Sequence, residues 1–265
     1  MPEWLRSYPQ LLRSAVQVTL TYRGRLLFMF AGALFPMLLL FVWLTVASES
    51  STLPGWDAGR FVSYYLAAVV VNDITASEIS WSFDADLRTG ELAAKLLRPF
   101  PVFHQYVATE AGSRLVTVPI FGAVLVVLTV AVPMVAFPSG FASLVAALVA
   151  AAVAFVLAVL MSSTFALVGF WTTQSGNVYM LWWGLGAFVS GWIAPLALMP
   201  SWLQHTAELL PFRYALGFPV ELALGVETGS AIGGFAIAFA WIAAFIVLYA
   251  LLWRRGIRHF QAVSG

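Results

Sequence analysis

The chain has 265 residues, of which 62% are hydrophobic and 9% carry a charge. Soluble domains carry about 25% charged residues, so a lipid bilayer is the expected solvent of this chain. The net charge of +1 gives no support for nucleic-acid binding, and the absence of cysteine excludes disulfides and thiol chemistry.

Six apolar stretches approach the length of about 20 residues that a helix needs to cross a bilayer. Turns that contain proline or glycine separate them, for example at 54–55, 138–140 and 200. The predicted fold class is therefore an all-α integral membrane protein, with a single six-helix transmembrane domain over 1–265. In chain order, the six predicted spans cover roughly 26–47, 61–81, 115–132, 141–171, 178–198 and 231–253.

The segment 1–25 precedes the first span and has a helical pattern of its own. Leu11, Ala15, Val18 and Tyr22 fall on one helical face, and arginines flank them. This pattern predicts an interfacial helix in the inner headgroup region, and the alternative is a cytosolic extension of the first span. A cleaved signal peptide fits less well, because the apolar run starts after residue 25 and is longer than the apolar part of a signal peptide.

The orientation follows from the positive charges, because cytoplasmic loops of membrane proteins are enriched in Lys and Arg. With the N-terminus inside, all of the 13 Lys and Arg residues except Arg60 and Arg213 lie on the cytoplasmic side. Both termini are therefore expected inside. The loop 82–113 is expected in the cytoplasm, and the segment 200–230 is expected on the outer side.

The sequence contains no motif of a common enzyme class or of a nucleotide-binding protein. A GxxxxGK[ST] phosphate loop is absent, since Lys95 is the single lysine and no Ser or Thr follows it. His104, His205 and His259 lack the spacing of metal ligands, and no GxSxG motif occurs. We therefore predict no catalytic, cofactor-binding or metal-binding residue. A membrane enzyme is not excluded, because such enzymes can use carboxylates that are dispersed along the sequence.

The second predicted span carries polar residues in the stretch VVVNDITASEISW. Asp73 lies about 18 Å along the span from Phe61 at a rise of about 1.5 Å per residue. A charge at that depth usually faces protein or water, so Asn72, Asp73 and Glu78 are candidates for a transport pathway. Two alternatives are a helix–helix contact, and a span that ends early and leaves Asp73 near the inner interface.

The predicted cytoplasmic loop begins with SFDADLRTGELAAKLLRPFP, residues 82–101. On a single helix over 86–98, four charged side chains form one polar stripe with leucines beside it. Two prolines then end the helix. We predict a short amphipathic helix under the membrane, either with a solvated charged face or as a docking element for a cytoplasmic partner. The stripe consists of Arg88, Glu91, Lys95 and Arg98.

The segment 200–230 is too apolar for a water-exposed loop and too rich in proline for one long helix. Pro200, Pro211 and Pro219 interrupt it, and aromatic side chains lie between them. This composition predicts short helices that partly re-enter the outer leaflet, packed in protein. The alternative is a belt of aromatic side chains that lies flat on the outer surface.

Two motifs, in their order along the chain, carry a resemblance to a known family. GELAAKLLRP follows the second span, and LPFRYALGFPVELALG lies between the fifth and sixth spans. Together with the six-span layout and the interfacial helix, they resemble the permease subunits of type-2 ABC exporters.

The resemblance implies that the segment 86–98 is a coupling helix, which docks on a separate ATPase subunit. It also implies that the outer segment forms short re-entrant helices. The implied docking positions are Asp86, Arg88, Gly90, Glu91, Leu92, Lys95, Leu96 and Arg98. The implied re-entrant positions are Pro211, Phe212, Arg213, Tyr214, Pro219 and Glu221.

The resemblance further implies the partners and the function. The partners are a cytoplasmic ABC ATPase dimer, which binds ATP and magnesium, a second permease subunit, identical or different, and the lipid bilayer. The chain itself is expected to bind no cofactor. The implied function is export across the cytoplasmic (inner) membrane of a prokaryote. The aromatic-rich, weakly charged membrane interior suggests amphiphilic or apolar cargo, drug-like or lipid-like, although 21 phenylalanines also suit contact with lipid.

Two other functions stay open at this point. The first is an ion-coupled secondary transporter with Asp73 or Glu78 as the titrating group, although six spans are few and no inverted repeat is visible. The second is a membrane enzyme or a structural partner of another membrane protein.

Overall fold

The computed structural model describes residues 7–21, 24, 31–49, 55–135, 137, 140–172, 174–226 and 230–260. Within these ranges all regular elements are helices, which confirms the all-α prediction. Among the described residues, three helices are long and apolar enough to cross a membrane. They are α7 (Val102–Ala131), α8 (Phe141–Ala166) with its 3₁₀ extension η2 (Leu167–Phe170), and α13 (Ala231–Gly256).

The other predicted spans correspond to shorter helices, so a count of six spans stays a prediction. The described part of the first span is α3 (Leu34–Glu49), and residues 26–30 of that span lie outside the described residues. The third span is longer than predicted, because α7 begins at Val102 rather than near residue 115.

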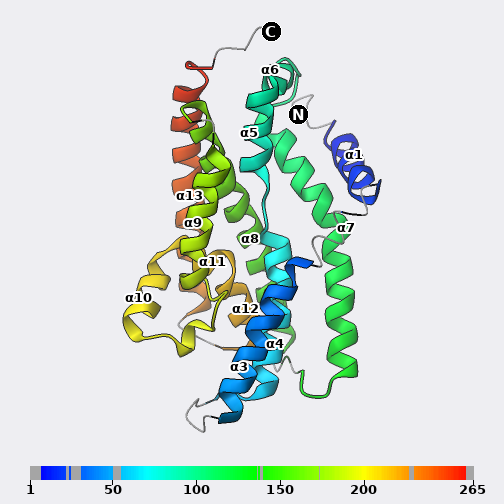
Figure 1. Cartoon of the computed structure of the whole chain (residues 1–265), viewed down its shortest axis with the longest axis vertical. Helices are drawn as coiled ribbons and strands as arrows, with labels where there is room; N and C mark the ends of the chain where they lie inside the picture. The colour runs from blue at the N-terminus through cyan, green and yellow to red at the C-terminus, as the bar shows by residue number, and fades with distance from the viewer. Residues whose placement is uncertain are drawn as a thin grey trace.

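The second predicted span is not one helix. α4 (Ala58–Thr75) and α5 (Ile79–Thr89) lie end to end, with residues 76–78 between them (Figure 1). The ψ angle of Ala76 is 132°, which takes the chain out of the helix. The prediction of a continuous helix over 61–81 was therefore wrong. No local signal marks the break in the sequence, because residues 76–78 include neither Pro nor Gly.

The fifth predicted span also ends early. α9 (Ser175–Val189) stops nine residues before the expected end at 198, and the chain turns at Gly191, whose φ is +90°. Four short helices follow before α13. They are η3 (Leu196–Leu198), α10 (Ser201–Leu209), α11 (Pro211–Ala215) and α12 (Gly217–Leu224).

Side chains from α3 and α4 bind the irregular backbone after α9. The Tyr64 hydroxyl donates to the carbonyl oxygen of Gly191 at 2.7 Å. The Tyr65 hydroxyl and the Trp43 indole N–H donate to the carbonyl oxygen of Ile193 at 2.8 and 3.1 Å. Non-helical backbone at membrane depth is tolerated when protein groups bind it in this way.

The packing centres on α8, which has a row of small residues. α4, α12 and α13 all pack against this helix, and α11 does so as well. Small side chains let helix backbones approach closely without a large side chain between them. The buried alanines of α8 are Ala147, Ala150, Ala151, Ala154, Ala158 and Ala166.

The N-terminal helix α1 (Tyr8–Thr21) packs along α7 (Figure 1). Its buried residues are Ala15 and Thr19, and a Cβ at Gly112 of α7 would lie 2.4 Å from the Cβ of Ala15. Close packing at Gly112 therefore holds α1 against the helix bundle. Its predicted place in the headgroup region stays a prediction, and residues 1–6, 22–23 and 25 lie outside the described residues.

Candidate functional site

The predicted docking segment is two helices rather than one. α5 ends at Thr89, Gly90 adopts a left-handed conformation with φ +78°, and α6 (Glu91–Leu96) begins directly after it. Glycine takes this conformation without steric cost, so Gly90 ends one helix and starts the next. The prediction of a single helix over 86–98 was therefore wrong, and its four charged residues do not form one stripe.

Lys95 turns away from the predicted stripe. Its ammonium group contacts the carboxylate of Asp86, which also accepts a hydrogen bond from the Tyr106 hydroxyl. The same ammonium group lies 4.5 Å from the centre of the Tyr106 ring. These contacts hold α6 against α5 and α7, so Lys95 acts inside the fold.

Two other predicted docking residues are also covered within this chain. Asp86 is 5% exposed and Leu92 is fully buried. Both side chains pack inside this chain, and docking through them stays a prediction.

The residues that do face outward at this end form a smaller set. Arg88, Glu91 and Arg98 are exposed, and Leu97 is 88% exposed. Arg98 also donates to Gln105 at 3.3 Å. We call Arg88, Glu91, Leu97 and Arg98 the exposed tip. Leu97 was not among the predicted docking positions, although a large apolar side chain at the end of a short helix before a proline marked it as a candidate for the surface.

α5 connects the exposed tip to the break at 76–78, and two polar contacts fix it to neighbouring helices. Asp84 accepts from the backbone N–H groups of Ser175 and Gly176 at 3.1 and 2.7 Å, which binds the free N–H groups at the start of α9. The Ser80 hydroxyl donates to the carbonyl oxygen of Ser162 on α8 at 2.8 Å. The helix is thus held at its start by Ser80 and at its middle by Asp84.

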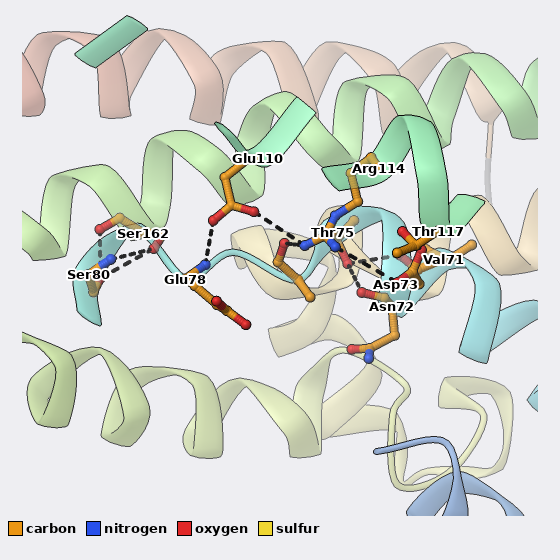
Figure 2. A network of polar contacts seen from close by, with 11 residues as sticks. Val71, Asn72, Asp73, Thr75, Glu78, Ser80, Glu110, Arg114, Thr117 and Ser162 are labelled. Atoms are coloured by element: carbon orange, nitrogen blue, oxygen red, sulfur yellow. Dashed lines mark hydrogen bonds and ion pairs between the residues drawn. The ribbon is translucent and has the colours of Figure 1, made fainter. Parts of the chain in front are cut away.

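The break itself is bound by charged side chains of α7, as Figure 2 shows. Glu110 accepts from the backbone N–H of Glu78 at 2.7 Å, and Arg114 donates to the carbonyl oxygen of Ala76. Arg114 also lies 3.4 Å from Glu110 and 3.8 Å from Asp73. α7 thus supplies hydrogen bonds to backbone groups that lost their helical partners at the break.

Asp73 lies in the last turn of α4 and faces α7. Its carboxylate accepts from Thr117 at 2.8 Å, and only 6% of the residue is exposed. Asp73 therefore makes the helix–helix contact, between α4 and α7, that was one of the interpretations of its position in the sequence. Glu110 and Arg114 were missed at the sequence level, although an acid and a base four residues apart inside an apolar helix indicate a buried ionic contact.

The three pathway candidates have different surroundings. Asp73 is buried, the side chain of Glu78 is exposed, and Asn72 is partly buried. In Figure 2 the amide of Asn72 points away from the charged network. The structure thus brings Asp73 and the backbone of Glu78 to the break, and places Asn72 on another side of α4.

Comparison with known proteins agrees with this architecture. The family model of the ABC-2 family transporter protein matches residues 33–264. The chain belongs to this family. It is a membrane transport component of the ABC-2 permease type, and such permeases associate with an ABC ATPase. A search of curated proteins gives no match. α1 precedes the matched range.

The segment 200–230 of the ABC-2 permease, predicted on the outer side, is built around a second buried ion pair. Arg213 of α11 donates to Glu221 of α12 at 2.8 Å, and both residues are buried. The Tyr214 hydroxyl donates to the carbonyl oxygen of Glu208 at 2.6 Å, and the Phe212 ring lies 4.4 Å from that of Trp182. Pro211 begins α11, and Pro219 is buried within α12. These residues pack in protein, whereas re-entry into the leaflet stays a prediction.

Proposed function

We propose that this permease is the membrane subunit of an ATP-driven exporter that moves amphiphilic or apolar cargo outward. A separate ATPase dimer binds ATP and magnesium and docks on the exposed tip. A second permease subunit, identical or different, completes the pathway. The assembly lies in the cytoplasmic membrane of a prokaryote, with both termini of this chain inside.

The connection between the exposed tip and the break carries this proposal. α5 is 11 residues long, so it spans about 16 Å at a rise of about 1.5 Å per residue. It begins at Ile79, beside the break, and ends at Thr89, next to Gly90 and the tip. A push on the tip therefore reaches residues 76–78 through a single short helix.

Three backbone residues separate α4 from α5, and they form a hinge in this proposal. Hinges are usually a few residues at the ends of helices, which absorb changes in backbone angles. Closure of the ATPase moves the tip and α5, and the hinge changes the position of α5 relative to α4. The polar contacts of Glu110 and Arg114 define the resting position of the hinge.

The position of Asp73 argues against the ion-coupled alternative. A titrating group of a secondary transporter must release its proton or ion in each cycle. Asp73 instead accepts from Thr117 and lies near Arg114, in a contact between two helices. This arrangement supports a carboxylate that keeps its charge throughout the cycle rather than one that takes up and releases a proton or ion.

A substitution at the exposed tip tests the docking part of the proposal. Truncating a central apolar contact of an interface typically costs about 2 kcal/mol, which is roughly thirtyfold in affinity. We expect Leu97→Ala to weaken binding of the ATPase that co-purifies with this permease by at least about tenfold. The matched control is Leu209→Ala, a 72% exposed leucine of α10 on the predicted outer side. Equal affinities of the two variants and the parent would remove the exposed tip from the interface.

A further inference from the structure

Two cavities meet at α4. The smaller one has a volume of about 60 Å³ and lies among α4, α8, α9 and α11. The larger one, of about 190 Å³, lies among the start of α3, α4 and α7, and Phe121 and Asp73 are on its wall. Asn72 and Trp192 line both cavities, so these two residues stand at the point where the cavities meet.

Two polar groups at this point have no hydrogen-bond partner in the described part of the chain. The indole N–H of Trp192 is one, and the residue is 5% exposed. The side-chain amide of Asn72 is the other; this residue is only partly buried, and its amide points away from the charged network in Figure 2, so Trp192 is the buried donor at this point. Buried polar groups are nearly always hydrogen-bonded, so an unpartnered donor beside a cavity indicates a bound acceptor.

The third polar group is the carboxylate of Asp73, on the wall of the larger cavity. Its Oδ2 accepts from Thr117 at 2.8 Å, and its Oδ1 lies 3.8 Å from Arg114. That distance is longer than a hydrogen bond, and Arg114 lies closer to Glu110 and to the carbonyl oxygen of Ala76. The Oδ1 atom therefore has room to accept from a further donor.

We infer that this junction binds the positively charged nitrogen of an amphiphilic organic cation. Asp73 supplies the counter-charge, and the Trp192 ring supplies the π-face that attracts organic cations. The Trp192 N–H and the Asn72 amide bind an acceptor atom of the same molecule. The inference rests on the proposed transport function and narrows its cargo to molecules that carry both a cationic nitrogen and an acceptor.

The cation has two chemical sources. One is a free amphiphile that enters from the membrane, and the other is a lipid with an ammonium headgroup. Both offer a cationic nitrogen, an oxygen acceptor, and an apolar part for the walls around Phe121 and Val69.

Rhodamine 6G is a suitable probe, because it is a lipophilic fluorescent cation that carries an ester. Its binding to the purified full chain in a neutral detergent is measured by fluorescence anisotropy. We expect Asp73→Asn to raise the Kd by at least about tenfold, because it removes the counter-charge. The control Asp57→Asn makes the same change at the exposed N-terminal cap of α4, where Asn also caps, and should leave the Kd within about twofold.

A second variant separates binding from folding. Asn72 makes no side-chain hydrogen bond in the described part of the chain, so Asn72→Leu breaks no internal contact. We expect this variant to keep the parent melting temperature and to raise the Kd for rhodamine 6G by about fivefold. If Asn72→Leu and Asp73→Asn both bind the dye as tightly as the parent, the inference is wrong. It is equally wrong if the uncharged dye Nile red binds with the same dependence on Asp73.

Nanodiscs distinguish the two sources of the cation. In phosphatidylglycerol nanodiscs no lipid ammonium competes with the dye. If the site holds a lipid headgroup, phosphatidylethanolamine nanodiscs weaken dye binding, and Asp73→Asn removes that difference. If the site takes a free amphiphile, the two lipids give the same Kd, and the effect of Asp73→Asn persists in both. These measurements need no ATPase, so their failure is distinct from a failure of docking at Leu97.

Discussion

Glu110 of α7 accepts a hydrogen bond at 2.7 Å from the backbone N–H of Glu78, 32 residues earlier in the chain. The acceptor lies on α7, five residues before the predicted span 115–132, and the donor belongs to the residue directly before α5. The contact therefore joins the hinge to a neighbouring helix rather than to solvent.

Removing this acceptor should destabilise the resting hinge. Glu110→Ala leaves the Glu78 N–H and the Arg114 guanidinium with fewer partners, and we expect a loss of about 2 kcal/mol in the free energy of unfolding. Thermal unfolding of the purified permease in detergent measures this loss. Glu110→Gln keeps a carbonyl acceptor and should lose less. The exposed Glu91→Ala should change the free energy by under about 0.5 kcal/mol. Equal losses for Glu110→Ala and Glu91→Ala would contradict the role of the contact.

Gly191 should not tolerate a side chain. Its φ of +90° is rarely adopted by L-residues, and a Cβ there would lie 2.5 Å from the Tyr64 hydroxyl oxygen. We expect Gly191→Ala to destabilise the permease by about 1–3 kcal/mol, through backbone strain and loss of the Tyr64 hydrogen bond. The matched control is Gly184→Ala in α9, where no atom lies within 4 Å of the added Cβ. That change should be neutral or stabilising by up to about 1 kcal/mol, because Ala favours helix more than Gly does. A smaller effect at Gly191 than at Gly184 would show that the turn is not rigid.

A disulfide beside the hinge should block its motion. The Oγ atoms of Ser80 and Ser162 are 3.2 Å apart, so cysteines at both positions bring two sulfurs close together. The chain has no cysteine, which leaves no competing pair. We expect the oxidised Ser80→Cys, Ser162→Cys permease to bind its ATPase and to lower the ATPase rate of the complex several-fold. A reducing agent should restore the rate, and each single cysteine variant should behave like the parent. An unchanged rate in the oxidised protein would mean that α5 moves together with α8.

Local sequence patterns predicted the long helices and missed the connections between them. An apolar run of sufficient length is enough to predict α8 and α13 from the sequence, because a helix needs about 20 apolar residues to cross a bilayer. The break at 76–78 has no such local cause. Arg114 binds the carbonyl oxygen of Ala76 across 38 residues of sequence, and this contact becomes visible only when the helices are packed.

The docking segment illustrates a second limit. The spacing of Glu91 and Lys95 favours an ion pair on one helix, and the sequence-based prediction therefore continued one helix through Gly90. The structure pairs Lys95 with Asp86 instead, nine residues earlier, which a single helix does not allow. A glycine between two short amphipathic stretches was the signal for a helix end.

The central claim is that the ATPase moves the hinge at 76–78, and the reactivity of a cysteine at Ser77 tests it most directly. Ser77 is 6% exposed and its hydroxyl has no hydrogen-bond partner in the described part of the chain, so Ser77→Cys is a conservative change. The measured quantity is the rate of modification by N-ethylmaleimide in the complex with the ATPase, without nucleotide and after trapping with ATP and vanadate. We expect trapping to change the rate by at least about fivefold, and Leu97→Ala to abolish that change. The same rate in both states, within about twofold, would contradict a hinge that the ATPase drives.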